Sequence, residues 1–343
     1  MIQIILLALI ISLLLVPLNK YLSTKFNIIS YPRERDAHTK PIPRMGGLSI
    51  VLSFLIVSVY GYITILYSHN AESTKFLGIL VGAIILYIVG ILDDIYQIKA
   101  THKLFGQIIA VICAMAGGVE ITFLVLDNPG ILASIVYILK VMATFIWIIG
   151  MINAMNLVDG LDGLASGIAI IASICFMVIA ICQGNIVAVI LVSALAGAVL
   201  GFLPYNFRPA SIFMGDTGSM ILGYTLAIVA SELAFEFLDP VCIIAPVLIL
   251  GVPIFDTASA ILRRLINHKP IFEADKEHTH HKLMANGFSH KTSVIILYVF
   301  SACFGILGVL LKVQMQLKYV VVAIVVLIIL LKIISKKTTD DVA

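Results

Sequence analysis

Acidic residues in this sequence lie at the ends of long apolar runs. Asp93 and Asp94 close an apolar run over 77–92, and Asp216 stands between two glycines just before another. A carboxylate at the centre of a membrane helix costs about 2.5–3.5 kcal/mol on insertion scales. A chain that accepts this cost repeatedly is expected to bind a cation, a phosphate through a cation, or a proton at these positions.

Adjacent carboxylates on a helix point about 100° apart, so one of the pair can face a metal while the other faces a second group. A second polar group has a regular spacing, because its members recur every three residues: Asn153, Asn156, Asp159 and Asp162. This spacing places neighbours on one face of a helix. Gly160 and Gly163 permit a break or a close backbone approach there. Two amides and two carboxylates that converge can hold a hard cation and hydrogen-bond a ligand.

Asp216 belongs to the segment Phe213-Met-Gly-Asp-Thr-Gly-Ser. Oxygen ligands on a glycine-containing turn at a helix N-terminus suit Mg²⁺ together with a phosphate. Phe213 can stack on a base, although core packing is the commoner role of a single Phe. The loop His38–Gly47 supplies Lys40 and Arg44, whose charges can neutralise phosphate. A basic flank of a membrane span would explain these charges, but not the prolines and glycines beside them.

Three histidines lie close together in the segment ADKEHTHHKL: His278, His280 and His281. A zinc site is disfavoured because neither cysteine nor an HExxH motif accompanies them, and adjacent histidines do not easily bind one ion. Imidazole donors, with Arg263 and Arg264 nearby, fit a diphosphate or a sugar better. The groups together are those of a phosphoryl-transfer site.

The composition predicts the elements that carry these residues. The chain is 61% hydrophobic and 12% charged, with mean hydropathy +1.12, whereas soluble domains are about a quarter charged. About 20 apolar residues cross a membrane as a helix. We expect an all-α polytopic membrane protein, a single domain over 1–343, with eleven spans at 2–22, 46–67, 77–92, 102–118, 136–155, 164–182, 185–203, 217–233, 241–260, 293–311 and 319–335.

Lys and Arg residues indicate the orientation. Most lie in the connections after spans one, three, five, seven and nine and in the C-terminal tail, whereas the opposite side carries only Lys75, Lys140, Lys312 and Lys318. We therefore expect a plasma-membrane protein with its N-terminus outside and its C-terminus in the cytoplasm. Every polar group described above falls in a cytoplasmic connection, so the sequence predicts one site assembled from five cytoplasmic loops.

At this point the sequence resembles the polyprenyl-phosphate N-acetylhexosamine-1-phosphate transferases of glycosyltransferase family 4. The matching stretches are KPIPRMGG, ILDD, NAMNLVDGLDGLASG, PYNFRPASIFMGDTGS and ADKEHTHHKL, in the family's order. The last of these resembles the branch that begins teichoic acid linkage units and O-antigens. The peptidoglycan branch has three consecutive histidines, where this chain has Thr279 interrupting the run.

The resemblance implies a reaction in which UDP-GlcNAc and undecaprenyl phosphate give undecaprenyl-diphospho-GlcNAc and UMP. It implies Mg²⁺, replaceable by Mn²⁺, on Asp216 and Asn156, with Asp93, Asp94 and Asp159 in the catalytic centre. A uridine pocket would contain Lys40, Gly160, Leu161, Asp162, Asn206 and Phe213. The remaining residues would contact the diphosphate or the sugar: Arg264, His278, His280 and His281. The expected partners are the two substrates and the bilayer, with no nucleic acid, and a homodimer is left open.

One departure concerns a lysine. The peptidoglycan branch has a lysine four residues after the first acid of the Asp pair, where this chain has Gln97. Lys99 and Lys103 are both candidates to replace it.

Three alternatives stay open at this stage. The same reaction could use another UDP-N-acetylhexosamine. A cation-coupled transporter would also bury acids, but near the middle of the bilayer rather than at one face. A CDP-alcohol phosphotransferase requires Ala-Arg after its Asp-Gly, a pattern that Leu164-Ala-Ser-Gly167 breaks.

Overall fold

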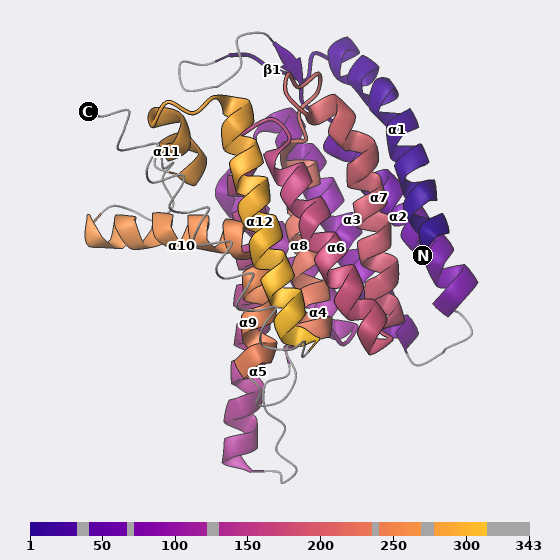
Figure 1. Cartoon of the computed structure of the whole chain (residues 1–343). Helices are drawn as coiled ribbons and strands as arrows, with labels where there is room; N and C mark the ends of the chain where they lie inside the picture. Colours follow the sequence, from indigo (N-terminus) through magenta and orange to yellow (C-terminus); the bar gives the residue numbers. More distant parts are fainter. Residues whose placement is uncertain (33–40, 67–71, 122–129, 235–239, 269–277, 314–343) are drawn as a thin grey trace.

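The computed structural model describes residues 1–32, 41–66, 72–121, 130–234, 240–268 and 278–313 (Figure 1). Within these residues the chain forms helices and one small antiparallel pair of strands, β1 (Ile29–Ser30) and β2 (Ile42–Pro43). The helices before residue 160 are α1 (Ile2–Lys25), α2 (Gly47–Gly61), the π-helix η1 (Tyr62–Leu66), α3 (Ser73–Tyr96), α4 (Ala100–Ala116) and α5 (Ile131–Val158). Those after it are α6 (Leu164–Gln183), α7 (Ile186–Asn206), α8 (Gly215–Ala234), α9 (Pro240–Ile249), α10 (Gly251–Ile266), α11 (Thr279–Ala285) and α12 (His290–Lys312).

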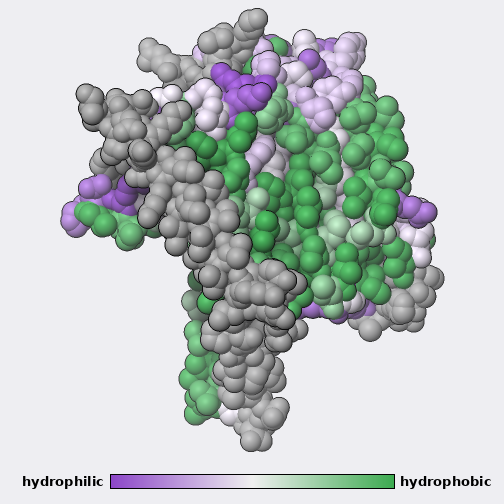
Figure 2. All heavy atoms as spheres, viewed as in Figure 1, coloured by the Kyte–Doolittle hydropathy of each residue, from purple (hydrophilic) through white to green (hydrophobic). Residues whose placement is uncertain are grey.

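Seven described helices are long and apolar enough to cross a membrane, or eight if the bent pair α9–α10 counts as one span. Hydrophobic residues cover the flank of the bundle, and hydrophilic residues gather at its upper end (Figure 2). A polytopic helical membrane protein is therefore confirmed. The predicted count of eleven spans stays a prediction: α4 is a shorter apolar helix, and the span expected at 319–335 lies outside the described residues.

Helix α8 is the centre of the bundle. It packs against α2, α3, α5, α6, α7 and α9, and its side chains from Met220 to Ala230 are buried. Tyr224 donates a hydrogen bond to the carbonyl of Ile79 on α3 at 3.0 Å. Small residues allow close packing between membrane helices. A Cβ on Gly223 would lie 2.4 Å from the carbonyl oxygen of Met151 on α5, so glycine sets this helix spacing.

The span expected at 241–260 is broken in the structure. Helices α9 and α10 meet at Leu250 with a bend of 89°, and α10 projects sideways from the bundle (Figure 1). Proline explains the break, since Pro253 in the first turn of α10 has no N–H to donate and is tolerated only near a helix start. Phe255, Leu262 and Ile266 on α10 are exposed, whereas Asp256 and Arg264 face the protein. An apolar outer face of this kind is typical of a helix lying along a membrane surface.

Candidate active site

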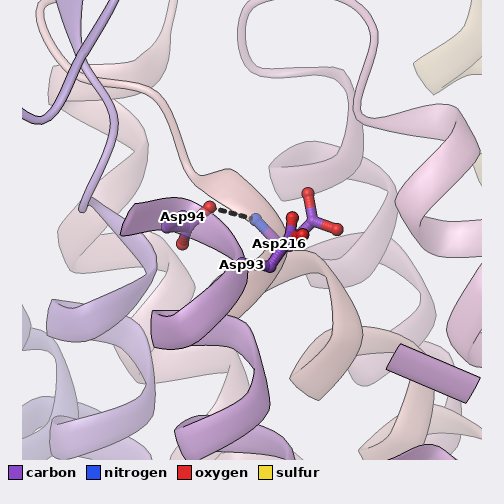
Figure 3. A group of neighbouring side chains, drawn as sticks. All are labelled: Asp93, Asp94 and Asp216. Atoms are coloured by element: carbon purple, nitrogen blue, oxygen red, sulfur yellow. Dashed lines mark hydrogen bonds between the residues drawn. The ribbon is translucent and has the colours of Figure 1, made fainter. Parts of the chain in front are cut away.

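Three buried aspartates converge where α3 ends and α8 begins (Figure 3). Asp93 and Asp94 lie on the last turn of α3 and Asp216 on the first turn of α8. One carboxylate oxygen of each lies within 4.8 Å of the others, close enough for a shared metal ion. The structure therefore joins two of the sequence segments through helix ends rather than through loops.

Asp94 holds the N-terminus of α8. Its Oδ1 accepts from the backbone N–H of Asp216 at 2.9 Å, and its Oδ2 accepts from the N–H and hydroxyl of Thr217 at 3.2 and 2.6 Å. The first N–H groups of a helix have no partner within the helix, so a carboxylate there is stabilising. A Cβ on Gly215 would lie 2.5 Å from Asp94 Oδ1, and its φ of +72° also favours glycine. The GDTG segment is thus shaped to receive this carboxylate.

The carboxylates of Asp93 and Asp216 lie next to each other, and that of Asp94 lies on the other side of the Asp216 backbone nitrogen (Figure 3). Asp93 and Asp216 also share a lysine. Lys103 Nζ, on the first turn of α4, lies 2.8 Å from Asp93 Oδ2 and 2.7 Å from Asp216 Oδ2. Gln97 instead adopts a left-handed conformation at the end of α3, where it begins the turn into α4. Lys99 is exposed. Of the two candidate lysines, only Lys103 meets the carboxylates.

Arg44 is a site residue that the candidate set derived from the sequence omitted. Its Nη2 lies 3.2 Å from Asp216 Oδ1 and its Nε 3.4 Å from Asp94 Oδ1. Backbone pairing positions it: Phe213 N donates to Pro43 O at 2.8 Å, and Gly46 N donates to Phe213 O at 2.9 Å. The signal was present in KPIPRMGG, but the sequence does not reveal which cation of the motif faces the acids. Lys40 lies outside the described residues.

The polar residues of the segment 153–162 do not all lie beside the aspartate cluster. Asn156 Nδ2 donates to Ser219 Oγ at 2.9 Å, one turn along α8 from Asp216, so its amide lies beside the cluster. Asn153 turns away and pairs with Gln107 at 2.9 Å. Asp159, just beyond α5, is half-buried. Desolvation and the nearby charge of Asp216 raise the pKa of Asp159 well above that of an ordinary carboxyl group. Asp159 therefore belongs to the electrostatic surroundings of the cluster.

The residues assigned to the uridine pocket are held mainly by backbone contacts. Asp162 Oδ2 accepts from Ala210 N at 3.1 Å. Asn206 Oδ1 accepts from Gly163 N at 3.1 Å and from Ser166 Oγ at 2.9 Å. These bonds tie the DGLDG turn to the segment after α7. Leu161 is buried, Gly160 is exposed, and Phe213 is half-buried.

The histidine segment packs against the same turn. A Cβ on Gly160 would lie 2.8 Å from His280 Nε2, so glycine makes room for this ring. His280 and His281 form a tilted ring pair at 4.2 Å between centroids. Burial, followed by the neighbouring His281, lowers the pKa of His280 to about 4, so its imidazole is neutral at pH 7. Arg264 is buried on α10.

Sequence reasoning missed Asp256. Its carboxylate is buried and bonds His278 Nδ1 at 2.8 Å and Thr279 N at 2.7 Å. The available signal was an acid inside an apolar run, the same signal that marked Asp93. Asp256 falls inside the predicted span 241–260, and no role was predicted for it.

The donor set of the three aspartates fits a hard divalent cation. Asp93 Oδ1 is buried and has no hydrogen-bond partner among the residues that the structure describes, and such an oxygen is costly unless an ion or proton satisfies it. Carboxylate oxygens are the ligands that Mg²⁺ prefers. Asn156, beside this cluster, stays a predicted ligand.

Comparison with known proteins identifies the family of the chain. The model of Glycosyl transferase family 4 matches residues 76–234. A Bacillus subtilis protein named probable undecaprenyl-phosphate N-acetylglucosaminyl 1-phosphate transferase is 39% identical over 303 residues, covering 88% of this chain and 82% of the relative. The chain belongs to glycosyl transferase family 4.

Other members of the family are similar along most of the chain. The undecaprenyl-phosphate alpha-N-acetylglucosaminyl 1-phosphate transferase of Thermotoga maritima is 31% identical, covering 91% of each protein. A phospho-N-acetylmuramoyl-pentapeptide-transferase of Bacillus cytotoxicus is 33% identical, covering 80% of this chain and 84% of that protein. The predicted family is thus confirmed.

Proposed function

We propose that this protein transfers N-acetylglucosamine 1-phosphate from UDP-GlcNAc to undecaprenyl phosphate, releasing UMP. The reaction would take place at the cytoplasmic face of the plasma membrane and begin a surface polymer such as a teichoic acid or an O-antigen. The names of the Bacillus and Thermotoga relatives support the acceptor and the sugar.

The observation that carries the proposal is the meeting of Asp93 and Asp216 with Lys103 and Arg44 at one end of the bundle. Phosphoryl transfer requires positioning and the stabilisation of charge more than covalent chemistry. When bound by Asp93, Asp94 and Asp216, with Asn156 beside them, Mg²⁺ would neutralise charge on the diphosphate. Lys103 and Arg44 both pair with Asp216 and would supply positive charge that limits repulsion between the anionic substrates.

The lipid phosphate needs little activation. A phosphate monoester has a second pKa of about 6, so it is largely a dianion at pH 7. An oxygen of the lipid phosphate would attack the β-phosphorus of the donor and form a new P–O bond. The bond between the β-phosphorus and the bridging oxygen would break at the same time, and UMP would leave with that oxygen and the electron pair of the broken bond. Asp93 would position the lipid phosphate or accept its residual proton. Inversion at phosphorus supports direct attack, whereas retention would indicate an aspartyl-phosphate intermediate.

The remaining predicted residues would bind the donor. Asp162 and Asn206, with Gly160, Leu161, Phe213 and Lys40, are proposed for uridine. Arg264 and the three histidines are proposed for the diphosphate or the sugar. The contact between His280 and Gly160 supports placing these two groups next to each other.

A second candidate is the same reaction with another UDP-N-acetylhexosamine. The 33% identity to a phospho-N-acetylmuramoyl-pentapeptide-transferase keeps this candidate open, because the metal and uridine parts do not distinguish the sugars. A cation-coupled transporter is less consistent with acids gathered at one end of the bundle.

The test is UMP release by purified protein given undecaprenyl phosphate, Mg²⁺ and a panel of UDP-sugars, with Asp216→Ala as the matched inactive variant. UMP formed only with UDP-GlcNAc, and lost in the variant and without metal, would support the proposal. UMP formed with a different sugar would support the second candidate. No UMP with any sugar, from protein shown to be folded, would reject the transferase proposal.

A further inference from the structure

Asp256 joins two elements that the sequence separates by more than twenty residues. It lies on α10, the helix that projects from the bundle (Figure 1). Its carboxylate bonds His278 and Thr279 at the start of α11. Oδ1 accepts from both the N–H and the hydroxyl of Thr279, at 2.7 and 2.6 Å. Oδ2 lies 2.8 Å from His278 Nδ1. The two oxygens therefore have separate partners.

The bond from Oδ2 determines which nitrogen of the His278 ring carries the proton. A carboxylate only accepts hydrogen bonds, so the proton between Oδ2 and the ring must lie on Nδ1. Nε2 is then the nitrogen left to act on a ligand. The ring stacks on His280 at 5.8 Å between centroids, and His280 contacts the Gly160 turn beside Asp159. His278 is thus connected through His280 to the turn that carries Asp159, and the charge of Asp216 acts on Asp159.

We propose that Asp256 is a positioning residue that acts through His278, holding the proton on Nδ1 so that Nε2 faces the diphosphate of the donor. The inference rests on the proposed function. With a bound diphosphate on one side and Asp256 on the other, the ring lies between two anions and is stabilised with both nitrogens protonated. His278 then presents a charged N–H to the group on which negative charge develops.

The competing explanation is that Asp256 only anchors α11 through Thr279. Two substitutions separate the alternatives. In Asp256→Asn the amide oxygen can still accept from Thr279, but the amide N–H₂ would face the ring and reverse its tautomer. Thr279→Val removes the hydroxyl bond and leaves the His278 bond in place. Ser259→Ala on α10 is the matched control, since within the described part of the chain the Ser259 hydroxyl bonds the backbone carbonyl of Asp256 and no other group.

The kinetic experiment is a double-mutant cycle on UMP release. We expect Asp256→Asn to lower kcat/KM by at least about tenfold, mainly through kcat. Thr279→Val and Ser259→Ala should stay within about threefold of wild type. In a His278→Ala background, Asp256→Asn should cost less than about threefold, because the residue through which it acts is gone. An equal cost in both backgrounds, or a cost of Thr279→Val as large as that of Asp256→Asn, would overturn the proposal.

The second readout does not depend on activity. In protein labelled with ¹⁵N-histidine, the His278 signal, assigned by its loss in His278→Ala, should show the Nδ1–H tautomer in wild type and the Nε2–H tautomer in Asp256→Asn. An Nε2–H tautomer in wild type would overturn the proposal even if the enzyme is active. Absence of UMP release with an Nδ1–H tautomer would instead reject the proposed function and leave the Asp256–His278 pair intact.

Discussion

Lys103 is the residue whose replacement tests the charge balance of the site. It bridges Asp93 and Asp216, so Lys103→Met would leave two buried carboxylates facing each other and remove a positive charge beside the substrates. We expect kcat to fall by about 10²–10³-fold, as for the loss of one charge-stabilising group in other enzymes. UMP release measures the change.

The matched control is Lys99→Met, at the residue just before α4. Lys99 is exposed, and we expect its replacement to alter the rate by less than about twofold. A larger loss in Lys99→Met than in Lys103→Met would contradict the assignment of Lys103 as the lysine of the site.

Asp93 and Asp94 are adjacent in sequence, but their replacement by alanine should affect stability and activity differently. Asp94→Ala removes three hydrogen bonds to the start of α8, and the loss of a helix cap costs about 0.5–2 kcal/mol. Asp93→Ala removes a carboxylate with one buried oxygen that has no hydrogen-bond partner among the described residues, so we expect activity to be lost with little loss of stability. Thermal unfolding in detergent, measured beside UMP release, distinguishes them. Equal destabilisation in both variants would contradict these roles.

At the scale of elements, much of the chain was predictable because apolar length determines where helices form. The predicted span 164–182 corresponds to α6, and 185–203 to most of α7. The bend at Leu250 was not predictable from hydropathy, because a broken helix and a straight one have the same composition. The sequence offered Lys103 and Arg44 among several cations, but it did not show which of them meet Asp93. Both reach it only through the packing of α4 and the pairing of residues 43–47 with 213–214.

The contact of α3 with α8 depends on glycine. A Cβ on Gly90 would lie 2.4 Å from Thr217 Cα, so Gly90→Ala should push apart the two helix ends that hold Asp93 and Asp216. We expect a destabilisation of about 1–3 kcal/mol and a loss of UMP release. Gly150→Ala on α5 is the matched control because it meets no atom within 4 Å, and it should stabilise the helix slightly. Full activity in Gly90→Ala would mean that this spacing does not matter to the reaction.

The docking of α11 should depend on pH. Since the folded-state pKa of His280 is lowered to about 4 by burial, the unfolded chain binds more protons below its ordinary pKa of about 6.5. Stability should therefore be complete above pH 6.5 and fall as the pH drops toward 4. His280→Gln should show a flatter decline of the unfolding temperature over this interval. Identical slopes for wild type and variant would contradict the burial of a neutral ring.

At the scale of the whole molecule, the site occupies one end of the bundle, and the sequence predicts that this end faces the cytoplasm. Arg208 follows the end of α7 that lies at the site. Helix α4 begins near the site at Lys103 and runs to the opposite end of the bundle, and Glu120 follows that far end of α4. Glu120 is exposed and pairs with Lys140 at 2.8 Å, and the loss of such a surface pair costs at most about 1 kcal/mol. Arg208 is exposed as well, so we expect both positions to tolerate a cysteine probe.

The topology test uses these two positions in a chain whose five native cysteines have been replaced. A membrane-impermeant maleimide added to intact cells should label Glu120→Cys and leave Arg208→Cys unlabelled, because a cytoplasmic site is shielded by the bilayer. Inside-out vesicles should give the reverse pattern. Labelling of Arg208→Cys in intact cells would place the aspartate cluster outside, where UDP-sugars made in the cytoplasm could not reach it, and the proposed donor would have to be abandoned together with the orientation.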